Sequence, residues 1–528
     1  MRILTILVLI MLMFSTSLFC QDQNILWQNT IGGTSEDIIW TGLRTSNGDY
    51  LFGGSSTSNI SGDKTEDSNG SNDVWLVLLD TSGNIIWQST IGGIDYDALG
   101  AFEQTADGGF ILACTSDSDI SGDKTENSKG HTDYWIIKLD ATGEIEWQNT
   151  IGGTAHDQAR DIIQTIDGGY VVGGRSASDP SDDKSEFSFG GDDYWVVKLN
   201  SVGQIEWENT IQSWGQEDIS FIGQTSDGAY FVCGVSDGDI GADKTENSNG
   251  SQDIWILKLN SVGEILWQNT IGGSGVEWAH SALLSDDQGY ILAGTSNSDI
   301  SGDKLENSRG EADFWILKLN AAGDLVWQKT LGGNAIDVAL TVYNTDDKGY
   351  VVGGWSLSGA SGEKTEANFG SHDFWLVKLT NTGALEWENT IGGSDNDVAH
   401  IIFQDVDGLV IGGTSRSNIS FDKTEDKIGG HDYWVVKHSN NFLGVRENQL
   451  GNQIYVIPNP TSHILHVKSS NNNYIDTWSI FDFKGVRVLH GDTLGVIQTL
   501  DVSSLSAGIY YLQFSSQGKI STEKFIKE

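Results

Sequence analysis

The sequence predicts an all-β protein, in which a seven-bladed β-propeller is followed by a small β-sandwich domain. Three observations lead to this prediction. A Trp followed by Gln or Glu returns at intervals of 60 residues, each interval contains two β-rich hairpins, and the chain has 65 Gly but only 3 Pro, which suits many short turns. The repeated Trp residues are Trp27, Trp87, Trp147, Trp207, Trp267, Trp327 and Trp387.

The second unit shows how one blade is built. Residues 99–105 and 110–113 flank an Asp-Gly-Gly turn and form a first hairpin. After a long loop, residues 134–139 and 145–150 flank an Asp-x-x-Gly turn and form a second hairpin. Four antiparallel strands result, and the strand with the repeated Trp is the outermost. Seven such units can close radially, which leaves only short and protected strand edges.

The two ends of the repeat indicate a closed ring. The array begins at residues 25–30 with an outermost strand that no blade precedes, and the seventh unit ends at residues 433–437 without such a strand. We therefore expect the first strand to complete the last blade. An open stack of seven units is the alternative.

Fourteen of the 19 Trp residues occupy two positions of the repeat, and we expect them in the core because a buried aromatic side chain removes roughly 150–250 Å² from water. Residues 139–147, with a Thr-Gly turn before the Trp, resemble the tryptophan-docking motif of quinoprotein-type propellers. The resemblance implies a Trp that wedges between blades. It does not extend to quinone chemistry, because adjacent paired cysteines are absent. The second Trp set is Trp75, Trp135, Trp195, Trp255, Trp315, Trp375 and Trp434.

Residues 1–20 are typical of a secretory signal peptide. Arg2 supplies the positive charge, and the apolar run that follows is too short to span a bilayer. We expect the mature chain to begin near Gln21 and to contain no transmembrane segment. A lipid anchor on Cys20 is the alternative, although the bulky Phe19 fits poorly where small residues are expected.

Charge and cysteine content restrict the partners and the source of stability. The formal net charge is -43, from 73 acidic and 30 basic residues, so the surface repels phosphate backbones and nucleic acid is not expected as a partner. Cys114 and Cys233 fall at offset positions of units two and four. We expect no disulfide between them, and therefore a fold held by its core.

After the propeller at residues 21–439, a polar stretch at 440–453 reads as a linker and residues 454–528 form a separate domain. Its β-rich alternation predicts a small β-sandwich. Four segments in this order distinguish the domain, at 457–461, 480–488, 501–512 and 524–527. The residues that mark them include Pro458, Asn459, Pro460, Gly485, Gly508 and Lys524.

These segments resemble the type A sorting domain of the type IX secretion system of Bacteroidetes. The resemblance implies export across the outer membrane by that machinery, so that the protein is extracellular or on the outer-membrane surface. In this family the domain is often removed, and the cargo is then released or attached to the surface. An ordinary accessory β-domain is the alternative.

Strand direction places the two tight turns of every unit on one face of the propeller. The long loop and the Ile-Gly-Gly linker then lie on the other face, which we predict to be the binding face. An acid starts each inner strand, and its sevenfold repetition favours a structural role, because a catalytic acid needs a unique environment. These acids are Asp37, Asp97, Asp157, Glu217, Glu277, Asp337 and Asp397.

Recognition is expected where the repeat varies. One variable position lies three residues after the inner-strand acid, and we place it near the mouth of the central channel. Exposed Trp and Arg side chains suit stacking on sugars or anchoring of a protein partner. The predicted ligand-binding residues are Trp40, Arg160, Arg175, Trp214, His280, Trp355 and His400.

The long loop of the second unit has the oxygen spacing that opens a calcium loop, at Asp117, Asp119, Ser121 and Asp123. The bidentate Glu at the twelfth position is missing, since Ser128 stands there. In the alternative, Asp side chains close local turns and the loop Lys pairs with Glu on the surface. Calcium is the only cofactor that the sequence indicates.

We expect a monomeric, non-catalytic binding protein for a glycan or a protein. A secreted carbohydrate-active enzyme is the first alternative, with two channel-mouth carboxylates drawn from Asp37, Asp157 and Asp397. A structural or adhesion protein is the second. No Ser-His-Asp triad, HExxH helix or phosphate-binding loop is recognisable in the sequence.

Overall fold

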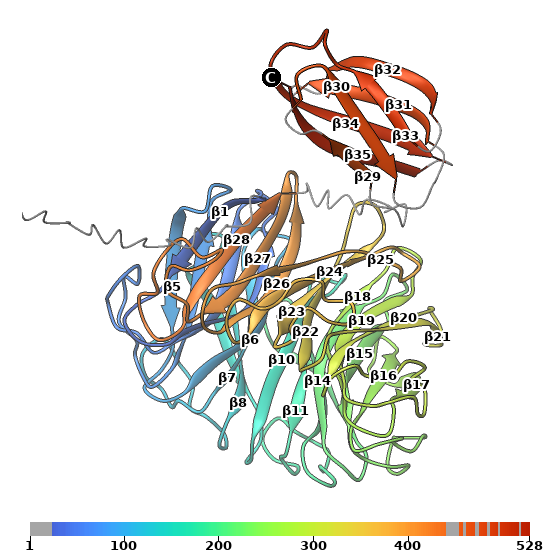
Figure 1. Ribbon diagram of the computed structural model, residues 1–528. Helices are drawn as coiled ribbons and strands as arrows, with labels where there is room; N and C mark the ends of the chain where they lie inside the picture. The colour runs from blue at the N-terminus through green and yellow to red at the C-terminus, as the bar shows by residue number, and fades with distance from the viewer. Residues whose placement is uncertain are drawn as a thin grey trace, which may run out of the picture. The chain divides into compact units, whose positions relative to one another are not determined.

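The computed structural model describes residues 24–439 and, beyond them, 454–457, 461–469, 475–482, 486–494, 497–516 and 519–527. The predicted signal peptide and linker lie outside the described residues. The chain divides into two compact units at residue 440. In the described ranges every regular element is a β-strand, as the sequence predicts (Figure 1).

The first unit is a seven-bladed β-propeller of four-stranded antiparallel sheets. Blades 1 to 3 are β2 (Asp37–Arg44), β3 (Tyr50–Ser56), β4 (Asp73–Leu79) and β5 (Ile85–Ile91); β6 (Asp97–Gln104), β7 (Phe110–Ser116), β8 (Asp133–Leu139) and β9 (Ile145–Ile151); and β10 (Asp157–Gln164), β11 (Tyr170–Ser176), β12 (Asp193–Leu199) and β13 (Ile205–Ile211).

The remaining blades repeat this order. Blades 4 to 6 are β14 (Glu217–Gln224), β15 (Tyr230–Ser236), β16 (Asp253–Leu259) and β17 (Ile265–Ile271); β18 (Glu277–Leu284), β19 (Tyr290–Ser296), β20 (Asp313–Leu319) and β21 (Leu325–Leu331); and β22 (Asp337–Asn344), β23 (Tyr350–Ser356), β24 (Asp373–Leu379) and β25 (Leu385–Ile391). Blade 7 joins β26 (Asp397–Asp405), β27 (Gly408–Ser415) and β28 (Asp432–Ser439) to β1 (Ile25–Ile31).

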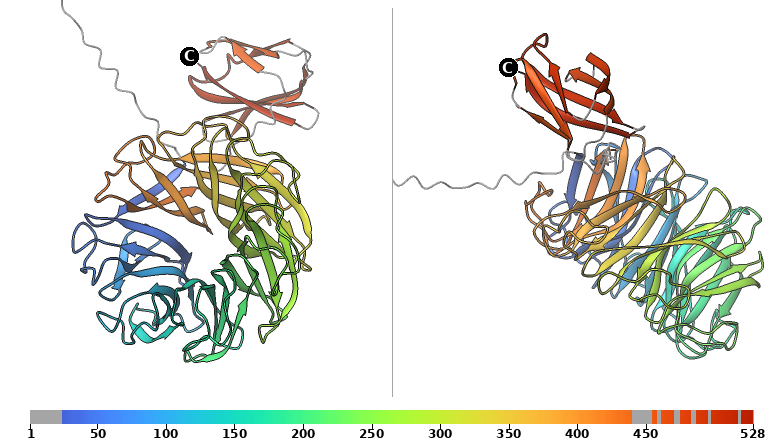
Figure 2. Two further views of the ribbon diagram at one scale, coloured as in Figure 1. Left: turned by 90° about the horizontal axis from the view of Figure 1, so that it is seen from below. Right: turned by 45° about the vertical axis from the view of Figure 1, so that its right-hand side comes forward.

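The N-terminal strand closes the ring, which confirms the prediction. Strand β1 pairs antiparallel with β28, with Thr30 opposite Trp434 and Ile31 opposite Tyr433. Figure 2 shows this blue strand within the orange blade, so that the chain's first and last propeller strands share one sheet. Because the pairing joins two ends of the array, backbone hydrogen bonds rather than a covalent link hold the ring shut.

Each inner strand has a β-bulge at its fourth residue. In β2 the register shifts between Ile39, opposite Gly54, and Thr41, opposite Gly53, so that Trp40 is the extra residue. The same shift occurs in the inner strand of all seven blades. A bulge leaves one residue unpaired and redirects its side chain. The variable position of the repeat is therefore the bulged position.

The two Trp sets differ in burial. The set that includes Trp75 is fully buried, whereas the set that includes Trp27 is only partly buried on the outer strands. Trp27, in blade 7, packs against the β4–β5 turn of blade 1. Its indole nitrogen donates to the carbonyl of Thr81 (3.2 Å), and its ring covers Gly83. This Trp is thus a wedge between blades, as the docking-motif resemblance implied, rather than a residue of the blade core.

The inner-strand acids bind neighbouring backbone N–H groups, as predicted. The Asp37 carboxylate accepts the N–H of Gly33 (2.7 Å) and the hydroxyl of Ser58 (2.9 Å), and Asp37 is completely buried. The long-loop lysine does not form the surface ion pair with Glu that the alternative to calcium predicted. Lys64 is buried, lies 5.6 Å from the ring centroid of Trp75 and donates to the hydroxyl of Thr90 (2.6 Å).

The second unit consists of two sheets, in agreement with a small β-sandwich. One sheet contains β29 (Ile454–Ile457), β30 (Ile464–Ser469) and β33 (Ile497–Asp501), and the other contains β31 (Ile475–Asp482), β32 (Arg487–Leu494), β34 (Gly508–Ser516) and β35 (Lys519–Lys527). Leu465, Ile480 and Leu512 are buried in its core.

Of the predicted sorting residues, Gly508 begins β34 and Lys524 lies in β35 opposite Tyr511. The other four, Pro458, Asn459, Pro460 and Gly485, lie outside the described residues. In the propeller, Cys114 and Cys233 are buried free thiols, so the expected absence of a disulfide between them agrees with the structure.

Candidate functional site: the loop face and the central channel

The inner strands of all seven blades surround a central cavity of about 490 Å³. We call the end of the propeller with the long loops and interblade linkers the loop face, and the end with the tight turns the turn face. All seven bulged residues line the cavity, so four of the seven predicted ligand residues lie there together. The four are Trp40, Arg160, His280 and His400, and the remaining bulged residues are Gly100, Ser220 and Leu340.

Aromatic and imidazole rings occupy two sectors of this wall. Trp40 is 43% exposed, packs edge-on against His400 with ring centroids 5.3 Å apart, and donates its indole N–H to Ser55 (2.9 Å). In blade 5, the ring centroid of the cavity-lining His280 lies 5.7 Å from that of Trp278, which does not itself line the cavity. Burial lowers the pKa of both histidines to about 4, so at neutral pH they present uncharged imidazoles that can donate or accept one hydrogen bond each.

The predicted arginines are already paired within the protein. Arg160 makes a bidentate contact with Asp218, at 2.9 and 2.6 Å. Arg175 contacts Asp192 (3.1 Å) and donates to the side-chain oxygen of Gln158. Because each guanidinium is held by a carboxylate, this cluster has a fixed shape and little free positive charge.

The other two predicted residues, like Arg175, are not among the residues that line the cavity. Trp355 stands in β23 at the repeat position of Arg175, and its ring packs edge-on against His372 with centroids 4.5 Å apart. Trp214 lies in the loop between β13 and β14 and is 62% exposed. It packs against Phe189, which is 39% exposed, with centroids 5.3 Å apart and planes at 39°.

A local exchange explains the position of Trp214. In unit one, the N–H of Thr34 donates to the hydroxyl of Ser61 (3.0 Å), and most other units make the equivalent bond. Unit four has Gly241 in place of that serine, and the indole lies over it: a Cβ at Gly241 would come within 1.9 Å of the ring. The missing side chain therefore makes room for an exposed aromatic ring.

Two carboxylates in the cavity wall were missed by the sequence reasoning. Glu103 and Asp161 are the acids among the residues that line the cavity, and the repeated acids Asp37, Asp157 and Asp397 do not line it. The signal was present, because the other six units have no acid at either position. The enzyme alternative therefore depends on Glu103 and Asp161 rather than on two acids drawn from Asp37, Asp157 and Asp397.

The environment of this pair shifts its protonation. Asp161 accepts the N–H groups of Ile222 (2.8 Å) and Ile162 (2.9 Å), and burial raises its pKa to about 7 despite those bonds. Glu103 accepts the N–H of Gln164, and burial raises its pKa as well. The negative charge of Glu103 contributes to the shift at Asp161, so the two carboxylates lie within electrostatic range of each other.

The side chains of the predicted calcium loop make local contacts. Asp117 accepts the N–H of Tyr96 (2.6 Å), Asp123 accepts the N–H of Gly92 (3.1 Å), and Ser121 donates to the carbonyl of Asp119 (2.8 Å). In the described ranges no three His, Cys, Asp or Glu side chains converge as metal ligands. The contacts agree with the alternative in which these residues close turns, and calcium stays a prediction.

Comparison with known proteins assigns the second unit. Residues 454–528 match the secretion system C-terminal sorting domain family. Regulatory protein FlaEY of Caulobacter vibrioides is 24% identical over 262 residues, or 45% of this chain. The match spans about a quarter (27%) of that relative's length.

Solved structures similar to this chain include two with low sequence identity. PorZ, an essential surface component of the type-IX secretion system of Porphyromonas gingivalis, is 10% identical, with a TM-score of 0.40 over 94% of this chain and 60% of its own. A puromycin hydrolase is 10% identical, with a TM-score of 0.43 over 83% of this chain and 59% of its own.

The sorting domain indicates a protein that is exported and then secreted or held at the cell surface. Among the residues that the structure describes, no helix is long and apolar enough to cross a membrane. The propeller consists of seven four-stranded sheets closed by its first strand. Residues 454–528 are therefore a type IX secretion system C-terminal sorting domain, carried behind a seven-bladed β-propeller.

Proposed function

We propose that the protein is exported by the type IX secretion system and binds a neutral glycan, without catalysis, through the loop face of its propeller. The observation that supports this proposal is the pair Trp214 and Phe189, two packed aromatic rings that stay exposed on the loop face. Aromatic faces of this kind suit the C–H face of a sugar ring. The net charge of -43 disfavours acidic polysaccharides.

The cavity can contribute further polar contacts to the same ligand. Its bulged residues lie in the half of each inner strand that begins at the loop face. His280 and His400 are neutral there and Trp40 is partly exposed. A chain of sugars could therefore stack on the outer aromatic pair and reach hydrogen-bonding groups at the channel mouth.

A glycan array with the mature chain tests this proposal. The double variant Trp214→Ala, Phe189→Ala should bind at least tenfold more weakly than the wild type, because both stacking surfaces are lost. Ile120→Ala is the matched control, since Ile120 is also exposed on a long loop (62%) but belongs to the regular repeat. Equal binding by the wild type and the double variant, or binding to no glycan, would contradict the proposal.

The array also tests calcium when it is repeated in EDTA. The contacts of Asp117, Asp123 and Ser121 with neighbouring backbone groups favour binding that persists without the metal. Binding that disappears in EDTA and returns with calcium would instead assign a calcium site, and Asp123→Asn would then be the variant to compare.

A carbohydrate-active enzyme is the second candidate, and it now rests on Glu103 and Asp161. A carboxyl with a pKa of about 7, beside a second carboxylate in a cavity, suits a proton donor in glycoside cleavage. Release of reducing ends from a bound polysaccharide, lost in both Glu103→Gln and Asp161→Asn, would support catalysis. A polysaccharide that binds and stays intact would support binding alone.

A further inference from the structure

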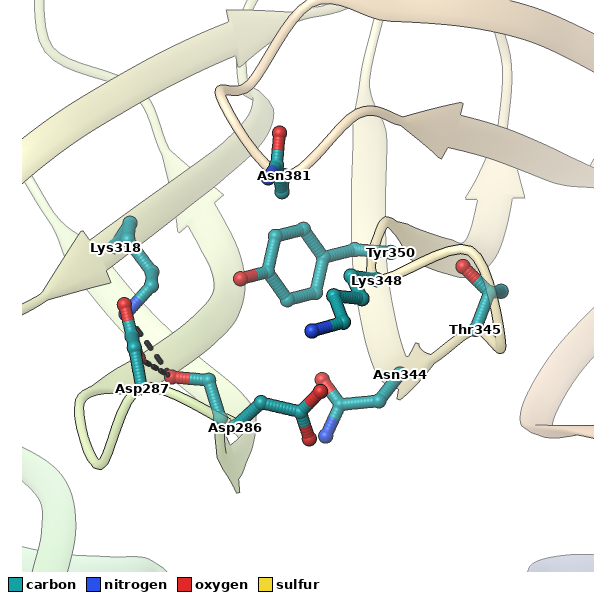
Figure 3. Close-up of a pocket in the computed structure, with 9 residues that line it drawn as sticks. Asp286, Asp287, Lys318, Asn344, Thr345, Lys348, Tyr350 and Asn381 are labelled. Atoms are coloured by element: carbon teal, nitrogen blue, oxygen red, sulfur yellow. Dashed lines mark hydrogen bonds and ion pairs between the residues drawn. The ribbon is translucent and has the colours of Figure 1, made fainter.

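A second pocket lies on the turn face, between blades 5 and 6, and it is separate from the loop face and the channel. Its volume is about 260 Å³. Residues from three turns and three strands line it, and Figure 3 shows their side chains. Those that carry the argument are Asp286, Lys318, Asn344, Lys348, Tyr350 and Asn381.

The pocket exists because one side chain of the repeat is shorter here. At four other blade junctions, a Gln at the end of the inner strand accepts a backbone N–H from the turn of the preceding blade, as Gln104 does from Ser46 (2.7 Å). At this junction the residue is Asn344, which instead donates to the carbonyl of Leu284 (3.0 Å). The bridge is not formed, and the space of the missing methylene group becomes part of the pocket.

A lysine replaces a turn glycine at the same place. In units one to four the third turn residue is a Gly in the left-handed backbone region, such as Gly108 with φ 88°. Unit six has Lys348 there, with φ 67°, a conformation that L-residues adopt only at a cost. Strain of this kind concentrates at functional positions, and Figure 3 shows the Lys348 ammonium directed into the pocket.

The charges around the pocket are not all paired. Lys318 forms an ion pair with Asp287 (2.8 Å) and donates to the hydroxyl of Ser285 (2.9 Å), so the charges of Lys318 and Asp287 are paired. In the part of the chain that the structure describes, neither Lys348 nor Asp286 makes an ion pair. The pocket therefore offers one free ammonium and one free carboxylate, together with the side-chain amides of Asn344 and Asn381 and the hydroxyl of Tyr350.

This set of groups selects the class of ligand. The pocket is smaller than the usual 300 Å³ or more of sites for drug-sized ligands, so it accepts one small molecule. Free charges of both signs disfavour an apolar molecule, a polyanion and a bare metal ion. A sugar hydroxyl donates and accepts hydrogen bonds at once, and so it can use a carboxylate, an ammonium and amides together.

We propose that this pocket binds one neutral hexopyranose, free or at the end of a chain, independently of the loop face. The hydroxyl groups donate to Asp286 and accept from Lys348 and the amides, while Tyr350 and the Lys318–Asp287 pair form the walls. The proposal names a second carbohydrate site on the face opposite to the first.

Two substitutions that restore the ordinary repeat test this site with little risk to folding. Asn344→Gln replaces the residue by the one found at four other junctions and refills the space. Lys348→Gly restores the turn glycine and removes the ammonium. Gln288→Gly is the matched control, because Gln288 has the same strained turn position in unit five (φ 64°) and does not line the pocket.

The probes are methyl glucoside, methyl galactoside and methyl mannoside, titrated into the mature chain and followed by calorimetry and by saturation-transfer NMR. We expect at least one to bind, tenfold or more weaker binding in Asn344→Gln and Lys348→Gly, and unchanged binding in Gln288→Gly. No binding of any methyl hexoside, or equal binding by both pocket variants and the wild type, would overturn the proposal.

Two further arms locate the site and its ligand. The Trp214→Ala, Phe189→Ala variant should keep hexoside binding while it loses the array signal, so that failure of one proposal leaves the other standing. Oligosaccharides that end in the bound hexose should bind as well as the methyl glycoside if chain ends are recognised. Weaker binding of such oligosaccharides would assign the pocket to the free sugar.

Discussion

At the scale of single residues, unit four has exchanged the positions of a glycine and a serine. In unit one, Ser58 accepts the N–H of Ser35 (2.9 Å) and faces Gly33, where a Cβ would approach the Ser58 Cβ to 2.5 Å. Unit four has Ser213 in place of that glycine and Gly238 in place of that serine. The hydroxyl of Ser213 accepts the N–H of Gly215 (3.0 Å). In both units a single serine hydroxyl accepts the equivalent backbone N–H. The space between the two positions holds only one side chain, which comes from one side in unit one and from the other in unit four.

This exchange predicts strong coupling between the two positions. Gly238→Ser alone should destabilise by about 1–3 kcal/mol, because its Cβ would lie 1.7 Å from the Ser213 hydroxyl. Ser213→Gly alone should cost about 1–3 kcal/mol by leaving buried polar groups unsatisfied. The double variant should recover most of the loss. Urea unfolding in a double-mutant cycle measures this coupling, and additive effects would show that the two sites are independent.

At the scale of elements, the contact between neighbouring blades depends on an outer-strand Trp and a turn glycine. Trp147 covers Gly203, where a Cβ would come within 2.6 Å of the ring, and Asn149 donates to the Gly203 carbonyl (2.8 Å). The same pair recurs at other junctions, for example Trp87 with Gly143. The turn thus closes its own hairpin and also forms the surface against which the Trp of the preceding blade packs.

A matched pair of glycine substitutions separates these two roles. Gly203→Ala and Gly168→Ala have nearly the same backbone, with φ of 80° and 82°, but no atom lies within 4 Å of a Cβ at Gly168. Gly168→Ala should cost about 1–2 kcal/mol from backbone strain alone. Gly203→Ala should cost about 1–3 kcal/mol more, because it also displaces Trp147. Equal losses of unfolding free energy would argue against Trp docking as a source of stability.

The sequence was sufficient for the elements and less so for the site. The period of Trp residues and the turn glycines determine the hairpins, and the orphan strand at 25–30 determines how the ring closes. The sequence did not show that one Trp set is fully buried and the other only partly buried. Both sets lie in apolar strands, and only the structure shows that the Trp27 set faces the next blade. Glu103 and the pocket at Lys348 depend on which side chains meet across blade junctions, and a pattern within one unit does not contain that information.

At the scale of the whole molecule, acids from neighbouring blades lie together at the junctions. The acid that starts the third strand of one blade is close to the acid that starts the inner strand of the next, as Asp193 is to Glu217 and Asp373 is to Asp397. Burial raises the pKa of Asp193 to about 8 and of Asp373 to about 7, and the neighbouring acid contributes to both shifts. The pKa of Asp253, Asp313, Asp397 and Asp432 rises to about 6.

The pH dependence follows from these raised values. An acid with a pKa near 4 when unfolded and 6 to 8 when folded stabilises the fold fully below pH 4 and loses that contribution as the pH rises through the folded-state value. His280 and His400 act in the opposite sense between pH 4 and 6.5, but they are two groups against at least six acids. The melting temperature should therefore fall from pH 5 to pH 8, as scanning calorimetry at constant ionic strength would show.

We expect a large contribution to this slope from the pair Asp193 and Glu217, because burial raises the pKa of both carboxyl groups and Glu217 raises that of Asp193 further. Asp193→Asn keeps an oxygen for the N–H of Phe189 (2.8 Å) but cannot ionise beside Glu217. The variant should match the wild type near pH 5 and lose less stability between pH 6 and 8. Asp119→Asn, on an exposed loop, should leave the profile unchanged. A wild-type melting temperature that rises across this range, or an Asp193→Asn profile parallel to the wild type, would mean that the junction acids are ionised in the folded protein and that other contacts offset their repulsion.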